Sequence, residues 1–203
     1  MSSKADQLID AALELFDERG YRATGIDAIL ARAGVAKMTL YKHFGTKDDL
    51  IVAAIRRAGE RGRAEMFTDI ERRAPTPRAR LLALFDVAET LVTRGSFRGC
   101  LFIRATGEFA DDDSPIKAVC EEHGVLVKRF LAGLAMQAGA DDPGPLADQL
   151  MLLFRGVLTA AQSNPAPASI APIIASARAA ASTLIDAALA DVDRDERAPH
   201  DAA

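Results

Sequence analysis

Residues 34–47 restrict the possible folds of this chain more than any other stretch. Leu40 and Phe44 lie four residues apart, so on a short helix from about residue 36 to 44 both would face a core. Gly34 precedes this helix and can take the positive φ that a tight helix–helix turn needs. Residues 27–33 predict another short helix before that turn. Two short helices joined in this way form a helix-turn-helix, whose second helix enters the major groove of DNA.

The charge of the same region favours contact with a phosphate backbone. No acidic residue lies between Asp27 and Asp48, although the whole chain of 203 residues has a net charge of −4. Residues 1–63 hold 11 Lys or Arg and 9 Asp or Glu, so the positive excess is confined to the N-terminal part. The alternative is a solvated basic face on a small helical domain. The cations of the acid-free window are Arg32, Lys37, Lys42 and Lys47.

Polar and exposed positions on and around the second short helix are the candidate DNA contacts. Thr24 can cap the preceding helix, which would leave its hydroxyl beside the helix dipole where a phosphate binds; a cap alone is the alternative. Lys47 is expected to contact phosphate. The full predicted set is Thr24, Lys37, Met38, Thr39, Tyr41, Lys42, His43 and Lys47.

Four runs of residues resemble the N-terminal module of the tetracycline-repressor (TetR) family. They are Gly20-Tyr21-Arg22-Ala23-Thr24, Ala33-Gly34-Val35, Thr39-Leu40-Tyr41-Lys42-His43-Phe44 and Thr46-Lys47-Asp48-Asp49-Leu50. Met38 and Leu30 depart from the family, which often has a small residue at the first position and Ala at the second. Met38 therefore bears on base contacts, and Leu30 on how closely the two short helices pack. The resemblance covers about the first quarter of the chain and implies a DNA-binding head.

The remainder of the chain predicts packed helices. It is 49% apolar and 5% aromatic, which suits helices better than sheet. With the head, the expected fold is all-α with about nine helices, a count that the family resemblance also implies. The expected domains are a three-helix head at residues 1–47, a larger body at 48–192 and a frayed polar tail at 193–203. Without a signal peptide or an apolar run of membrane-spanning length, we expect a cytoplasmic protein that does not contact a membrane.

Two cysteines and a histidine raise the possibility of metal or redox chemistry. Cys120 and His123 lie three apart on one predicted helical face, and Cys100 begins a neighbouring helix. A closed zinc site needs four ligands and no fourth is evident, so we expect no metal and no cofactor. A redox role of either cysteine stays open. No nucleophile-elbow, Walker or dinucleotide-binding motif occurs, which disfavours an enzyme and leaves no catalytic candidates.

The body is expected to bind a small molecule. Aromatic side chains from several helices could converge there, with a few polar groups to orient a ligand. For each phenylalanine the alternative is a plain core position. The resemblance favours a cavity without indicating its occupant. The predicted ligand-binding residues are Phe85, Phe102, Glu108, Phe109, His123, Phe154 and Arg155.

The last two predicted helices are expected to form a dimer interface. The family resemblance implies that they pair with their copies in a second subunit, and a two-fold dimer reads two half-sites of a pseudo-palindromic DNA operator. The predicted interface residues are Leu153, Val157, Ala160, Ile174, Ala177 and Leu184. The expected function is a homodimeric transcriptional repressor released from double-stranded DNA by an apolar or amphipathic ligand of unknown identity. The alternative is a helical small-molecule-binding protein or enzyme with a vestigial head.

Overall fold

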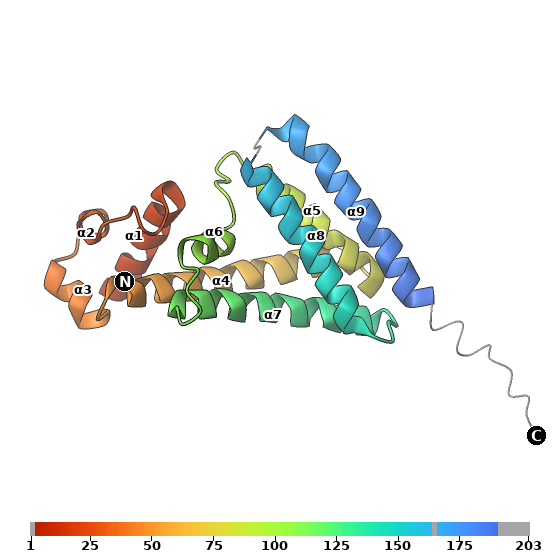
Figure 1. The fold of residues 1–203 in the computed structure, drawn as a ribbon, viewed down its shortest axis with the longest axis horizontal. Coiled ribbons are helices and arrows are strands. Elements are labelled where there is room, and N and C mark those ends of the chain that lie inside the picture. The colour runs from red at the N-terminus through yellow and green to blue at the C-terminus, as the bar shows by residue number, and fades with distance from the viewer. Residues whose placement is uncertain (1–2, 164–165, 191–203) are drawn as a thin grey trace, which may run out of the picture. The chain divides into compact units, whose positions relative to one another are not determined.

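The structure, a computed structural model, describes residues 3–163 and 166–190. Within these ranges the chain forms nine α-helices and no strands (Figure 1), which confirms the predicted fold class. The predicted tail at 193–203 lies outside the described residues. The helices are α1 Lys4–Arg19, α2 Ile26–Ala33, α3 Lys37–His43, α4 Lys47–Arg73, α5 Pro77–Val92, α6 Leu101–Glu108, α7 Pro115–Gln137, α8 Pro143–Ser163 and α9 Pro167–Ala190.

Local sequence sets several of the helix ends. Ser3 and Asp6 form a capping box at the start of α1, in which each side chain bonds the other residue's backbone N–H. Thr46 and Asp49 make the same reciprocal pair before α4: the Thr46 N–H donates to Asp49 Oδ2 at 2.9 Å and the Asp49 N–H to Thr46 Oγ1 at 3.1 Å. Both starts are set by a pair of residues three apart in the sequence.

The described residues divide into two compact units whose limits differ from the predicted boundary at 47/48. The head unit comprises the described part of Met1–Ala64 together with Arg98–Gly124. The body unit comprises Glu65–Phe97 and the described part of Val125–Ala203. Helices α4 and α7 each contribute residues to both units. The head unit therefore contains α6 and the start of α7 in addition to α1, α2, α3 and the first part of α4.

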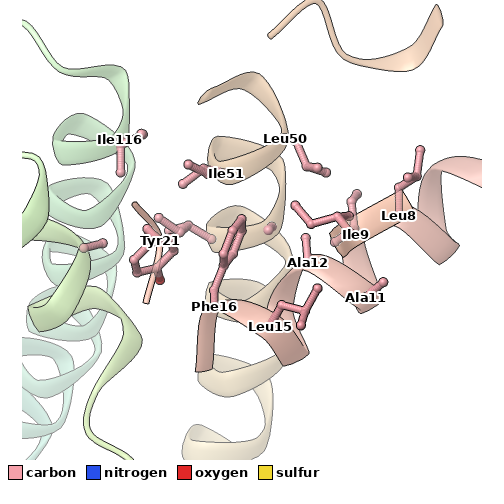
Figure 2. Close-up of a cluster of buried hydrophobic side chains, with 14 of the residues drawn as sticks. Leu8, Ile9, Ala11, Ala12, Leu15, Phe16, Tyr21, Leu50, Ile51 and Ile116 are labelled. Atoms are coloured by element: carbon pink, nitrogen blue, oxygen red, sulfur yellow. The ribbon is translucent and has the colours of Figure 1, made fainter. Parts of the chain in front are cut away.

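One hydrophobic cluster holds the head unit together (Figure 2). It combines α1 residues such as Leu15 and Phe16 with Ile51 of α4 and Ile116 of α7, all fully buried or nearly so. Tyr21 completes the cluster at 0% exposure, with its ring centroid 4.8 Å from that of Phe16. Its hydroxyl donates to the Leu101 carbonyl at 3.1 Å. Burial of this phenol raises its pKa above the ordinary value, so Tyr21 stays neutral and serves as a core residue.

The body unit is built on the packing of α5, α8 and α9, which contact one another pairwise. Charged pairs add to the apolar contacts between α5 and α9. Arg78 Nε donates to Asp186 Oδ1 at 3.0 Å, and Arg178 pairs with Asp86. In the same unit the rings of Phe67 and Phe130 stack at 3.9 Å, which joins the end of α4 to α7.

Candidate nucleic-acid interface

Helix α3 buries one face and exposes the other. Leu40 is fully buried and Phe44, just after the helix, is half-buried, so both lie against the head-unit core as predicted. The remaining side chains point away from that core. Met38 is 79% exposed and Tyr41 43% exposed. Lys37, Lys42 and His43 are also exposed, and Thr39 is half-buried.

Gly34 sets the angle between α2 and α3. Its φ of 63° and ψ of 38° lie in the left-handed region, which side chains other than glycine rarely adopt. Its N–H donates to the Leu30 carbonyl, and the Val35 N–H donates to the same carbonyl at 3.2 Å. These bonds end α2, and residues 34–36 form the turn before α3. The spacing of a helix-turn-helix is thus present as the sequence predicts.

Thr24 does not cap α2, so this part of the prediction is wrong. The N-cap residue is Gly25, which makes no side-chain cap. Thr24 is 0% exposed, and its hydroxyl donates to the carbonyls of Gly20 at 2.7 Å and Leu15 at 3.2 Å. The hydroxyl therefore satisfies carbonyls at the end of α1, and its burial makes it inaccessible to a phosphate.

Two cations of the acid-free window, Arg32 and Lys47, already bind partners within the head unit. Arg32 pairs with Glu14 at 2.9 Å and with Glu18 at 3.4 Å, both on α1. Lys47 Nζ donates to the Tyr21 carbonyl at 2.7 Å, and partial burial lowers the pKa of this lysine. Lys37 and Lys42 are the exposed cations that α3 itself carries.

Glu108, predicted as a ligand-binding residue, instead holds the corner between α1 and α2. Its Oε1 accepts the Tyr21 N–H at 3.0 Å and its Oε2 accepts the Arg22 N–H at 2.7 Å. Arg22 Nε donates back to the Glu108 carbonyl at 2.8 Å, and the Arg22 guanidinium lies 5.0 Å from the centre of the Phe109 ring. We call Glu108, Tyr21 and Arg22 the Glu108 clamp. Because Lys47 also donates to the Tyr21 carbonyl, the backbone N–H and the backbone carbonyl of Tyr21 are both hydrogen-bonded.

Arg104 attaches the same helix, α6, to the end of α1. Its Nη1 donates to the Asp17 carbonyl and its Nη2 to the Phe16 carbonyl, both at 3.0 Å. A cation at these carbonyls also complements the negative end of the helix dipole. Gly20 follows with a φ of 88°, and a Cβ there would lie 3.0 Å from Glu108 Oε1. The residue types Arg104 and Glu108, four apart, give no local signal of this role because their partners are over 80 residues away.

The other predicted ligand-binding residues do not form one cluster within either unit. Phe102, Phe109 and His123 lie in the head unit, where the Phe102 and His123 rings stack at 3.7 Å. Arg63 Nη1 lies 2.9 Å from His123 Nδ1, and because Arg only donates, this nitrogen is the acceptor. In the body unit, the predicted residues are Phe85 and Phe154, which are both buried, and an exposed Arg155.

A hollow of about 540 Å³ opens in the head unit beside the Glu108 clamp. Phe109 is the one residue it shares with the predicted ligand set. Its walls combine cations, carboxylates and a phenyl ring, so it is polar rather than apolar. The residues that line it are Arg22, Lys47, Asp48, Phe109, Asp111, Asp113, Ser114 and Pro115.

The two cysteines occupy different environments in the head unit. Cys100 is the half-buried N-cap residue of α6. Cys120 is 5% exposed within the hydrophobic cluster, and burial raises the pKa of its thiol to about 12. This thiol is therefore protonated near neutral pH and behaves as a small apolar side chain. Among the described residues, no group of three or more His, Cys, Asp or Glu is placed to hold a metal ion.

The predicted dimer residues divide by burial within the single chain. Val157, Ile174 and Ala177 are 1%, 5% and 8% exposed, so they face the chain's own core. The half-buried residues are Leu153, Ala160 and Leu184. The large apolar residues that α8 and α9 expose are the neighbours of predicted ones: Leu152 at 71% and Ile173 at 40%.

Helix α9 has an apolar composition, although much of its surface is exposed. Residues Ala168–Ala190 are long and apolar enough to span a membrane by length and composition, and 28% of their most apolar stretch is buried in the structure. Between the buried positions, the exposed residues of the helix are mostly Ala. A long apolar surface of this kind favours contact with another surface over contact with water.

Comparison with known proteins gives a consistent set of relatives. Residues 8–54 match the family described as "Bacterial regulatory proteins, tetR family". The HTH-type transcriptional activator FasR of Mycolicibacterium smegmatis is 42% identical over 89 residues, which is 41% of this chain and 39% of that protein. The HTH-type transcriptional repressor KstR of Rhodococcus jostii is 32% identical over 146 residues, 71% of this chain and 63% of that protein. The aligned part is thus less than two thirds of either relative.

The similarity to solved structures extends over most of the chain. A TetR-family transcriptional regulator from Streptomyces coelicolor superposes with a TM-score of 0.80 and 26% identity, covering 92% of this chain and 97% of that chain. The likeness therefore includes α4 to α9 in addition to the segment that the sequence resemblance covers.

Proposed function

Because the chain belongs to the tetR family, whose members are DNA-binding transcriptional regulators, we propose that it represses transcription as a homodimer on a pseudo-palindromic operator. The observation that carries the proposal is the exposed face of α3. That face combines two lysines, a tyrosine hydroxyl and a histidine with an apolar Met38, on a helix whose opposite side is buried through Leu40. Donors, acceptors and an apolar tip together match what phosphates and base edges offer.

The proposed DNA contacts are Lys37, Met38, Thr39, Tyr41, Lys42 and His43. The structure gives Thr24 and Lys47 other partners, so both become positioning residues in this proposal. Thr24 joins the α1–α2 corner to α1, and Lys47 joins the start of α4 to that corner. Each acts on DNA through the placement of α2 and α3.

We assign the dimer interface to the outer faces of α8 and α9. A second copy of the chain would cover Leu152 and Ile173 together with the Ala-rich surface of α9. A two-fold dimer also supplies the second reading helix that one short α3 requires for specificity. The half-buried Leu153, Ala160 and Leu184 lie at the edge of this proposed interface, whereas Val157, Ile174 and Ala177 support it from within.

The proposal includes release from DNA by a small amphipathic effector. Phe102 and His123 are half-buried and stack, and the Arg63 guanidinium lies against the histidine. An aromatic surface beside a cation suits a molecule with an apolar body and an anionic group. Straight-chain carboxylic acids are therefore the probes to titrate by calorimetry, with and without operator. Thermodynamic linkage requires that the acid weaken operator binding by the same factor by which the operator weakens acid binding. A coupling of about 1–3 kcal/mol would be ordinary. Equal affinities in the two titrations would exclude the acid as an inducer.

DNA binding is tested by selection from a pool of random-sequence duplexes, followed by fluorescence anisotropy on the recovered sequence at several salt concentrations. Lys42→Ala should flatten the salt slope by about one unit per protomer, because one phosphate contact is lost from each. Lys117→Ala is the matched control, since Lys117 lies in the same unit and already pairs with Asp112. Recovery of no duplex by the wild-type protein would contradict the proposed function.

The dimer is tested by sedimentation of wild-type protein, Leu152→Glu and Ile173→Glu. Both variants place a charge on the proposed interface and should sediment as monomers with unchanged helicity. Met136→Glu is the control, because Met136 is 64% exposed on α7, which is not one of the proposed interface helices. A wild-type protein that is monomeric at micromolar concentration would contradict the assignment.

A further inference from the structure

Met38 occupies the outermost line of α3. Met38 stands two residues before Leu40 and Lys42 two residues after it. At about 100° per residue, each therefore lies about 160° around the helix from Leu40. Because Leu40 is fully buried, this line points directly away from the head-unit core. Tyr41 and Thr39 lie on the two flanks. The exposed fraction follows this geometry, with 79% for Met38 against 43% for Tyr41 and less for Thr39.

Exposure of one methionine does not by itself require an explanation, because scattered exposed apolar side chains are normal. The position of Met38 is what carries the argument. When a helix lies in the major groove, its outermost side chains reach the base edges on the groove floor, and side chains on its flanks meet the walls, where the phosphates lie. Lys42 lies on the same line, and its long flexible side chain reaches either the phosphates or the base edges. The shorter Met38 can reach only the base edges on the groove floor.

The chemistry of the thioether leaves one complementary group on that floor. Methionine has no hydrogen-bond donor and its sulfur is a weak acceptor, so it cannot satisfy the N7, O6, O4 or amino groups of the bases. The exposed apolar group of the major groove is the C5-methyl of thymine. A flexible, polarizable side chain is also well suited to pack on a methyl group without exact geometry.

We propose that Met38 is a specificity residue that selects thymine at one position in each operator half-site, by packing on its C5-methyl group. This inference rests on the proposed function, since it assigns a role within the same DNA contact. It adds that the operator carries a symmetric pair of thymines whose methyl groups, rather than their hydrogen-bonding edges, are read.

The test is a methyl scan on the duplex that the wild-type protein recovers from the random-sequence pool. Each symmetric pair of thymines is replaced in turn by uracil, which removes only the methyl groups. Replacement of one of these pairs should lower wild-type affinity about 15-fold. Each lost methyl contact costs roughly 0.8 kcal/mol, or about fourfold, and the operator has two. In Met38→Ala the loss at that pair should vanish, while the effects at all other thymines stay the same.

Two further variants separate apolar packing on the methyl group from a dependence on side-chain length alone. Met38→Leu keeps an apolar side chain and should keep most of the methyl dependence, whereas Met38→Gln keeps the length and should lose it. Each substitution leaves the fold intact because the side chain is exposed, and circular dichroism checks this. If wild type binds the duplex and no uracil effect is relieved by Met38→Ala, this inference is overturned and the proposed function stands. If wild type recovers no duplex, the proposed function fails and this inference fails with it.

Discussion

The Glu108 clamp offers a sharp test of how the head unit is held together. Glu108→Ala removes the acceptor for two backbone N–H groups, at 3.0 Å from Tyr21 and 2.7 Å from Arg22. Tyr21 is 0% exposed, and a buried N–H left without an acceptor costs about 1–3 kcal/mol. Arg22 is exposed, and its N–H loses a charge-assisted bond that water partly replaces, at about 1 kcal/mol.

The expected total is a decrease of about 2–4 kcal/mol in the free energy of unfolding for Glu108→Ala. Glu108→Gln keeps one carbonyl oxygen and turns an NH₂ group toward the second N–H, so about half of that loss is expected. Urea unfolding followed by circular dichroism measures both variants. Amide hydrogen exchange at Tyr21 and Arg22 should accelerate in both, more strongly in Glu108→Ala.

The matched control is Glu122→Ala. Glu122 lies in the same unit, 4.0 Å from Arg56, with side chains 61% and 57% exposed. An exposed pair of this kind contributes about 0–1 kcal/mol. If Glu108→Ala costs no more than Glu122→Ala, or if exchange at Tyr21 is unchanged, the clamp does not stabilise the α1–α2 corner and the reasoning is wrong.

Three further expectations concern the two glycines of α4, Asp6 and Lys47. Gly62→Ala should raise the free energy of unfolding in urea by about 0.5–1 kcal/mol, because a Cβ there meets no atom within 4 Å. Gly59→Ala should be less stable than Gly62→Ala, since its Cβ would lie 3.1 Å from His123 Nδ1; equal stabilities would contradict this. Hydrogen bonds from Ser3 and Arg57 lower the pKa of Asp6 to about 2 from 3.8. Thermal melts of wild type should therefore lose this stabilisation as pH falls from about 4 to 2, and Asp6→Asn should lose less over that window. Lys47→Ala should lower the free energy of unfolding by about 1–2 kcal/mol, measured in urea against the exposed Lys42→Ala, which should change it little; equal values would show that the bond to the Tyr21 carbonyl is unimportant.

Features that depend on neighbours in the chain could be predicted from the sequence. The turn at Gly34, the burial of Leu40 and the exposure of Met38 all follow from spacing within one or two helical turns. The capping pair of Thr46 and Asp49 is a pattern of residues three apart. The exposed face of α3, which we propose contacts DNA, therefore follows from local sequence without knowledge of the remainder of the structure.

Burial of the last two helices could be predicted only in part. Periodicity identifies the apolar stripe of α8 and α9, and it does not say whether that stripe faces the same chain or a second one. Ile174 is 5% exposed and its neighbour Ile173 40% exposed, although both are isoleucines on one helix. The direction of each stripe is decided by packing against α5 and α8.

Tertiary structure alone decided which polar side chains form hydrogen bonds with backbone groups of the protein itself. Glu108, Lys47 and Thr24 are residue types that bind ligands or phosphates, and each instead satisfies backbone groups at the α1–α2 corner. The physical reason is that a buried N–H or carbonyl must be paired, and the chain meets this need with whichever polar side chain the fold brings near. For Glu108 that partner lies 87 residues away in sequence, a distance at which no local pattern carries information.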